Sequence, residues 1–135
     1  MTDTTSIRLT LGDDNQATQT IAAALAHVTT SDRPTATGRE LTLRLEPTRI
    51  GADTDAGRVA IGLEGGLVVV ELPTIAAALA RLHARPVRSE ASDGGALLFY
   101  DLARPVSVRL PWIGRLTFER APVAAQLADD DLIGL

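Results

Sequence analysis

Residues 20–26 read Thr-Ile-Ala-Ala-Ala-Leu-Ala, and residues 74–80 repeat them without a change. Residues 122–128 carry a looser version, Pro-Val-Ala-Ala-Gln-Leu-Ala. Apolar residues three and four positions apart are typical of a helix that buries one face. Strand-like sequence precedes each copy. The recurrence therefore predicts a chain organised around two principal helices, with a third short helix over residues 122–128.

The first helix is expected to begin after Asp13 or Asp14, since either carboxylate can accept hydrogen bonds from the free N–H groups of a first turn. Its core-facing stripe consists of Ala17, Ile21, Ala24, Leu25 and Val28. The second helix is expected to begin near Pro73, because proline suits a first helical turn. Its expected core-facing residues are Ile75, Ala78, Leu79 and Leu82, with Arg81, Arg85 and Arg88 exposed.

Alternation of apolar and polar residues predicts half-buried strands at 6–11, 40–46, 106–110 and 115–119. Residues 58–63 and 67–72 are expected to form a hairpin across Gly65 and Gly66, since glycine tolerates the positive φ of a tight turn. The second of these strands is apolar on both faces, as are residues 96–102, which predicts a central position. The segments 29–31, 51–57 and 89–95 are expected to be a fading helix end and two loops.

This order of elements, β-α-β-β-β-α-β-β-β-α, predicts an α+β protein. We expect a two-layer α/β sandwich, a mainly antiparallel sheet with two principal helices on one face. Residues 1–128 are expected to form a single α+β domain, and 129–135 an acidic and apolar C-terminal tail. The spacing of the two helices suggests an internal pseudo-twofold repeat. Convergence of alanine-rich helices on the same letters explains them equally well, and both explanations stay open.

The amino-acid composition limits the classes of function that this protein can have. The 135 residues carry a net charge of −4 and contain no cysteine, which argues against a general nucleic-acid-binding domain and excludes disulfides. All thirteen basic residues are arginine. No apolar run approaches the roughly 20 residues of a transmembrane helix, and residues 1–6 lack a secretory pattern. We therefore expect a cytoplasmic protein with no membrane contact.

The sequence shows no constellation typical of catalysis. His27 and His83 are the only histidines, both fall at the end of an expected helix, and neither has a carboxylate at helical spacing. Asp53 and Asp55 before Gly57 lack the further ligands of a calcium loop. We therefore predict no enzyme activity, no cofactor and no metal site.

Three features are typical of contact surfaces. The first is the polar face of the sheet, the second is Trp112, the only tryptophan, and the third is the acidic and then apolar tail. The candidate partner-binding residues are Arg8, Arg44, Arg109, Trp112, Arg115, Asp129, Asp130, Asp131, Leu132 and Leu135.

These features favour a non-catalytic protein–protein interaction or assembly module. It would be a subunit, an adaptor or a virion-type structural protein, with a protein partner or a homo-oligomer. One alternative is a small-ligand-binding domain with a pocket between helices and sheet. Another follows from the twice-repeated strand–helix–strands order, which resembles one domain of a DNA sliding clamp. That resemblance implies a DNA processivity module whose helices line a hole. The first expected helix, however, has no arginine between Asp13 and Thr30.

Overall fold

The structure is a computed structural model that describes residues 5–55 and 57–121. Its elements are β1 Thr5–Leu11, α1 Gln16–Ala24, η1 Ala26–Val28 (a 3₁₀ turn), β2 Thr29–Pro34, β3 Arg39–Leu45, β4 Ile50–Thr54, β5 Gly57–Glu64, β6 Leu67–Pro73, α2 Thr74–His83, β7 Arg88–Ser92, β8 Gly95–Tyr100, β9 Val106–Leu110 and β10 Gly114–Arg120. The expected third helix and the tail lie outside the described residues. The α+β composition with antiparallel pairing is as predicted.

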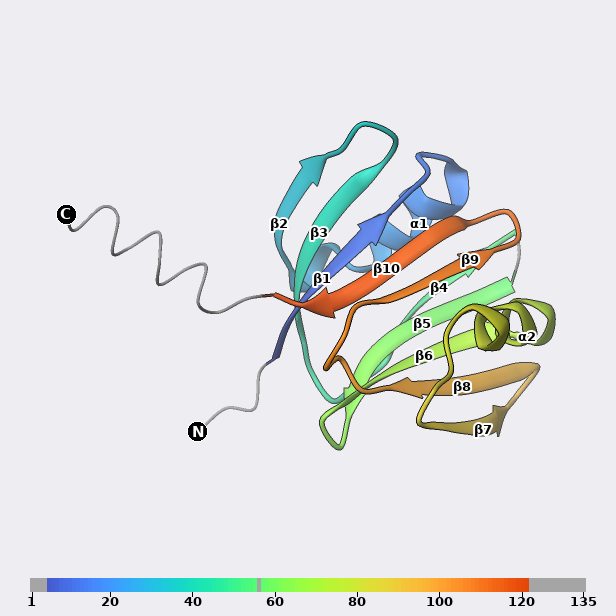
Figure 1. The fold of residues 1–135 in the computed structure, drawn as a ribbon. Coiled ribbons are helices and arrows are strands. Elements are labelled where there is room, and N and C mark those ends of the chain that lie inside the picture. The colour runs from blue at the N-terminus through green and yellow to red at the C-terminus, as the bar shows by residue number, and fades with distance from the viewer. Residues whose placement is uncertain (1–4, 56, 122–135) are drawn as a thin grey trace.

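The strands are divided between two sheets, where the sequence had predicted one. The first sheet has the order β2-β3-β1-β10-β9, and the second has the order β4-β5-β6-β8-β7 (Figure 1). Two short helices are too small to cover one face of a ten-stranded sheet. The strands instead bury their apolar faces against a second sheet, and one core cluster contains residues from both. Tyr100 of β8 and Phe118 of β10 meet in this core, with ring centroids 6.1 Å apart.

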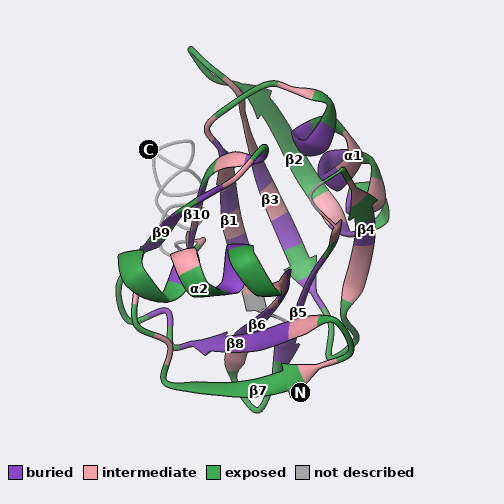
Figure 2. Cartoon of the chain, turned by 90° about the vertical axis from the view of Figure 1, so that its right-hand side faces the viewer, coloured by how far each residue is buried: buried purple, intermediate pink, exposed green. Residues whose placement is uncertain are grey.

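Both helices lie on the same side of the molecule, to the right in Figure 1 and facing the viewer in Figure 2. Each helix connects two strands of one sheet and also packs against a strand of the other sheet. The helix α1 connects two strands of the first sheet and packs against β4 of the second, whereas α2 connects two strands of the second sheet and packs against β9 of the first. The strand β10 ends on the opposite side (Figure 1).

The two sheets have the same strand order when each of β1–β5 is matched with the strand five places later. This matching converts β2-β3-β1-β10-β9 into β7-β8-β6-β5-β4, which is the second sheet read backwards. The identical heptapeptides do not occupy matching positions, because Thr20 is the fifth residue of α1 and Thr74 is the first of α2. The likeness of the two halves thus lies in their strand order, and a true internal repeat stays a prediction.

Two glycines occupy matching positions, Gly38 directly before β3 and Gly95 as the first residue of β8. A Cβ atom at Gly38 would clash with the carbonyl oxygen of Leu11, at the end of β1. A Cβ atom at Gly95 would clash with the carbonyl oxygen of Leu72, near the end of β6. In each half, therefore, only a glycine permits the backbones to approach this closely.

We predict that Gly38→Ala and Gly95→Ala each lower the free energy of unfolding by about 2–3 kcal/mol, since the backbone must shift. The control is Gly65→Ala, at φ 58° with nothing within 4 Å of its Cβ position. That change should cost only about 1 kcal/mol, for the left-handed conformation. Urea unfolding measures all three. Equal effects at Gly65 and Gly95 would contradict the close approach.

The expected hairpin is confirmed. The strands β5 and β6 are joined by Gly65 and Gly66, whose φ values are 58° and 81°. The strand β6 is central in its sheet, and Val68, Val69 and Val70 are at most 2% exposed.

Three strands were wrongly predicted to be loops or a helix end, namely β2, β4 and β7. All three lie at sheet edges. The edge strands β2 and β7 are almost entirely exposed, so neither face needs apolar residues. Charged residues and proline on such edges disfavour pairing with other chains, and they also erase the alternation on which the prediction depends.

Candidate interaction surfaces

The large exposed apolar side chains of the described chain lie on α2 and on segments next to it. They are Ile75 at 65%, Leu82 at 80%, Val87 at 59% and Trp112 at 72%. Ile75 and Leu82 lie on α2, and Val87 follows it. Trp112 lies in the turn before β10. Solvent exposure of four such residues on neighbouring segments has an unfavourable hydration free energy.

The prediction for the buried face of α2 was wrong. Ile75, Ala78 and Leu82 are exposed, and Leu79 is half-buried. The buried residues are Ala76, Ala77 and Ala80, which pack against β6, β8 and β9 (Figure 2). Because α2 begins directly after β6, the strand fixes the rotation of the helix. Alanines then face the sheets and allow a close approach.

The helix α1 follows the expected pattern, because a four-residue loop separates it from β1. Ile21 and Leu25 of the same heptapeptide are buried here. Its N-cap is Asn15, where an aspartate was predicted. The Asn15 side chain accepts a hydrogen bond from the N–H of Thr18 at 3.0 Å, and the Thr18 hydroxyl accepts one from the N–H of Asn15 at 2.9 Å.

Trp112 is held in an outward position by its backbone. Its φ of 61° is the left-handed region, which a bulky residue adopts at a cost. The next residue, Ile113, is fully buried. The Asn15 side-chain amide donates a hydrogen bond to the Trp112 carbonyl oxygen at 3.4 Å. Burial of Ile113 thus anchors the turn while the indole ring stays in solvent.

A groove of about 220 Å³ separates this turn from the start of α2. Its lining is mostly apolar, and consists of Pro73, Thr74, Ile75, Ala76, Pro111 and Trp112. We call Ile75, Leu82, Val87 and Trp112, with this groove, the α2–Trp112 surface. Arg81, His83 and Arg85 flank it as exposed basic residues. Neither arginine has an ion-pair partner among the described residues.

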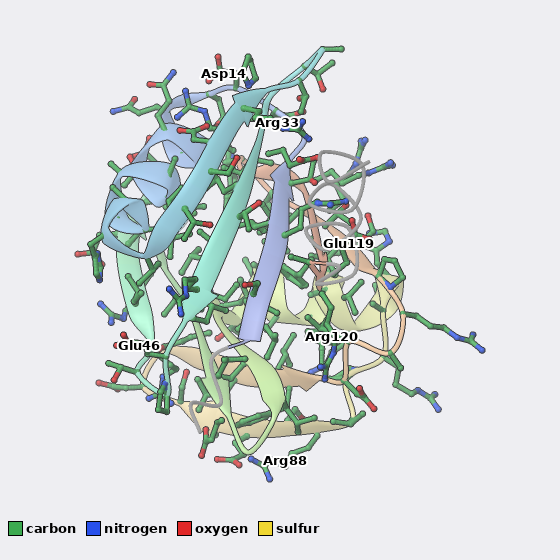
Figure 3. All side chains as sticks on the ribbon, turned by 90° about the vertical axis from the view of Figure 1, so that its left-hand side faces the viewer. Asp14, Arg33, Glu46, Arg88, Glu119 and Arg120 are labelled. Atoms are coloured by element: carbon green, nitrogen blue, oxygen red, sulfur yellow. The ribbon has the colours of Figure 1, made fainter. Side chains whose placement is uncertain are left out.

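The sheet face predicted from the alternation is present. Arg8, Arg44, Arg109 and Arg115 all lie on the polar face of the first sheet, as the pairing register requires. They are not one cluster. Arg44 lies at one end, opposite Ser6, and Arg109 and Arg115 lie at the other. Arg8 already has partners, because its guanidinium donates to Glu119 at 3.0 Å and lies 3.9 Å from Glu40. Glu119 is labelled in Figure 3.

Arg109 and Arg115 face each other directly across β9 and β10. Like charges in opposite positions are unfavourable, and neither residue has an ion-pair partner in the described ranges. We predict that Arg109→Glu raises the free energy of unfolding by about 0.5 kcal/mol. The gain, measured by urea unfolding, should disappear in 1 M NaCl. A loss of stability at low salt would instead mean that the pair is not repulsive.

A second groove, of about 520 Å³, lies on the outer face of the second sheet, beside the buried cluster of Val69, Leu97 and Phe99. Arg49 and Arg58 line it, and both approach Glu71, at 3.8 and 3.9 Å. The Arg88 guanidinium covers the Phe99 ring at 4.0 Å. The charges of this groove are therefore partly neutralised by each other.

In the described part of the chain, the side chains that could serve in catalysis or bind a metal do not cluster. Within residues 5–55 and 57–121, no three histidine, aspartate or glutamate side chains gather as metal ligands, and no helix is long and apolar enough to cross a membrane. His27 and His83 are both exposed. The residues Asp129, Asp130, Asp131, Leu132 and Leu135 lie outside the described residues.

Among the described residues, Tyr100 is the one group whose pKa is strongly shifted. It is 2% exposed, and its hydroxyl has no hydrogen-bond partner within the described part of the chain. Burial raises the pKa of Tyr100 to about 12, and the positive charge of Arg81 partly opposes this rise. The hydroxyl lies in the core between the two sheets, so the raised pKa makes the free energy of unfolding depend on pH.

Comparison of the chain with protein-family models, curated proteins and solved structures finds no match. Its function has to be inferred from the surfaces described above.

Proposed function

We propose that this protein is a non-catalytic interaction module that binds a protein partner through the α2–Trp112 surface. One observation carries the proposal: Ile75 and Trp112, two of the large exposed apolar side chains of the described chain, line one mostly apolar groove. Tryptophan beside an apolar groove is typical of binding hot spots. Arg81, in the last turn of α2, and Arg85, beyond the helix, are exposed and would select partners with acidic residues.

The alanines of α2 support this proposal. If the apolar side chains of α2 served only the core, they would face the sheets. They face outward instead, while Ala76, Ala77 and Ala80 are buried. The larger side chains thus form a surface that is stable when a partner covers it.

Light scattering from about 1 to 500 µM tests the proposal, because a second copy is the simplest partner. We predict that Leu82→Ser weakens self-association, so that the measured mass stays at that of the monomer up to a higher protein concentration than in the wild type. Arg44→Ala, an exposed change on the polar sheet face, should leave it unchanged. If Arg44→Ala alone weakened self-association, the polar sheet face would be the binding surface and the proposal would be wrong.

A second candidate, a sliding-clamp-like DNA processivity module, is favoured by the strand order. We infer that the two matching β-α-β-β-β-β halves arose by duplication, as the two units of a clamp domain do. Both helices also lie on one side, where clamp helices face DNA. Arg81 and Arg85 supply positive charge there, but Ile75 and Leu82 on the same helix are poorly suited to phosphates.

Fluorescence anisotropy with a labelled DNA duplex separates the two candidates. A clamp-like module should bind with a strong salt dependence that weakens in Arg81→Ala/Arg85→Ala. The interaction module predicts no binding above 100 mM NaCl. Arg44→Ala is again the control, since it removes one arginine from the other surface.

A further inference from the structure

We propose that the groove of about 520 Å³ on the outer face of the second sheet binds a free α-amino acid in its zwitterionic form. The guanidinium groups of Arg49 and Arg58 donate hydrogen bonds to the carboxylate of the ligand, and the ammonium group of the ligand donates to Glu71. No residue that lines this groove also lines the groove beside Trp112. The inference is therefore independent of the proposed function.

The strand pairing brings the three charged side chains together. Glu71 of β6 pairs with Ala60 of β5, and Ala60 pairs on its other side with Gly51 of β4, so these residues form one row across the sheet. Arg58 lies two positions before Ala60 on the same strand, and its side chain therefore has the same outward direction. Arg49 directly precedes β4 and approaches Glu71 from the opposite side of this row.

Two glycines allow the arginines to occupy these positions. A Cβ atom at Gly51 would overlap the guanidinium group of Arg58, which therefore lies against the backbone of β4. A Cβ atom at Gly62 would come within 3.0 Å of the Cα atom of Arg49, so a glycine there lets the segment before β4 lie against β5. The place of each guanidinium group thus depends on the backbone beneath it as well as on its own flexible side chain.

The three charged groups attract one another without forming hydrogen bonds. The Nε atoms of Arg49 and Arg58 lie 3.8 and 3.9 Å from Oε1 of Glu71, which is beyond hydrogen-bond distance. The Glu71 side chain is only 16% exposed, yet neither its carboxylate nor either guanidinium group has a hydrogen-bond partner among the described residues. Polar groups that are largely buried normally have such partners. Donors and an acceptor are therefore both free to bind a ligand in this groove.

The arrangement of charges favours a zwitterion over a simple ion. An anion would be attracted by the two arginines but repelled by Glu71, and a cation would be repelled by both arginines. An α-amino acid carries its two charges on neighbouring groups, so each charge meets an opposite one. The charged residues that line the groove are two arginines and two glutamates, namely Arg49, Arg58, Glu64 and Glu71. A ligand without net charge leaves this balance unchanged.

An NMR titration of isotope-labelled protein with each standard amino acid tests the proposal. The Nε–Hε signals of Arg49 and Arg58, assigned from the variants Arg49→Gln and Arg58→Gln, report binding at the groove. At least one amino acid should shift both signals in a saturable manner. The same compound without its amino group, and the same compound without its carboxylate, should each bind about 10-fold more weakly.

The variant Glu71→Gln keeps the size of the side chain and removes its charge. It should raise the Kd of the amino acid about 10-fold and abolish the preference over the compound without an amino group, because the repulsion of a simple carboxylate disappears. Gly51→Ala displaces the guanidinium group of Arg58 and should raise the Kd about 3-fold. Arg44→Ala, on the other sheet, is the control and should leave the Kd unchanged. The backbone amide signals show whether each variant is folded.

Three outcomes would overturn the proposal. Equal Kd values for the amino acid and the compound without an amino group, in the wild type, would mean a simple anion site. If no amino acid shifted the two arginine signals, or if Glu71→Gln left the Kd unchanged, the groove would not be an amino-acid site. Each of these failures leaves the proposed function in place, because Glu71→Gln should self-associate as the wild type does.

Discussion

Raising the pH from 9 to 11 should lower the free energy of unfolding by about 1 kcal/mol, and pH 12 should lower it by about 2, because of one side chain. Burial raises the pKa of Tyr100 to about 12, whereas an unfolded tyrosine titrates near 10. The folded state thus holds the proton more tightly. Its contribution is complete below pH 10 and is lost as the pH rises toward 12.

The composition makes this effect unusually easy to isolate. The chain has no lysine, no cysteine and no other tyrosine, and these are the side chains that ordinarily change charge between pH 9 and 11. Urea unfolding of wild type and Tyr100→Phe at pH 8 to 11 measures the difference, since the variant should show no loss in this window.

At pH 8 the variant should be more stable than the wild type by about 1 kcal/mol, because it removes a buried hydroxyl without a hydrogen-bond partner. Absorbance at 295 nm gives the pKa directly. A folded-state titration near 10, or a variant less stable at pH 8, would show that the hydroxyl reaches water or a partner.

Replacing Trp112 by alanine should weaken association about 30-fold, the largest effect expected of any exposed residue. The ring is 72% exposed, so its removal costs little stability in the monomer. Its φ of 61° holds the indole outward before a partner arrives, which lowers the entropy lost on binding.

Trp112→Phe is the matched variant, since it keeps an aromatic ring of smaller area. It should weaken association by about 3–10-fold, between wild type and alanine. Sedimentation velocity gives the constants. Equal association of wild type, Trp112→Phe and Trp112→Ala would contradict a role for this turn.

The sequence was sufficient to predict the strands that have one or two apolar faces. Alternation located β1, β3, β9 and β10, and continuous apolar runs located β6 and β8. The edge strands β2 and β7 carry no such pattern, because water covers most of their residues. The edge strand β4 has a single buried residue, Ala52, so it shows no alternation either. Division into two sheets depends on which strands pair, and pairing between distant segments leaves no periodic signal in either strand.

The candidate surface was predictable only in part. Trp112 was identified from its residue type and its place in a turn. The exposure of Ile75 and Leu82 was missed, because the apolar stripe was assumed to face the core. The available signal was the direct junction of β6 and α2 at Pro73, since a helix without a connecting loop cannot rotate freely. The alternative stripe of alanines at 76, 77 and 80 was the second signal.

The fluorescence of Trp112, followed while light scattering gives the mass, tests the central claim most directly. Trp112 is the only tryptophan, so its emission reports this surface alone. We predict that the emission maximum moves to shorter wavelength as the mass rises with concentration, since the partner removes water from the ring. A rise in mass with the emission of a solvent-exposed tryptophan would show that the protein assembles through another surface.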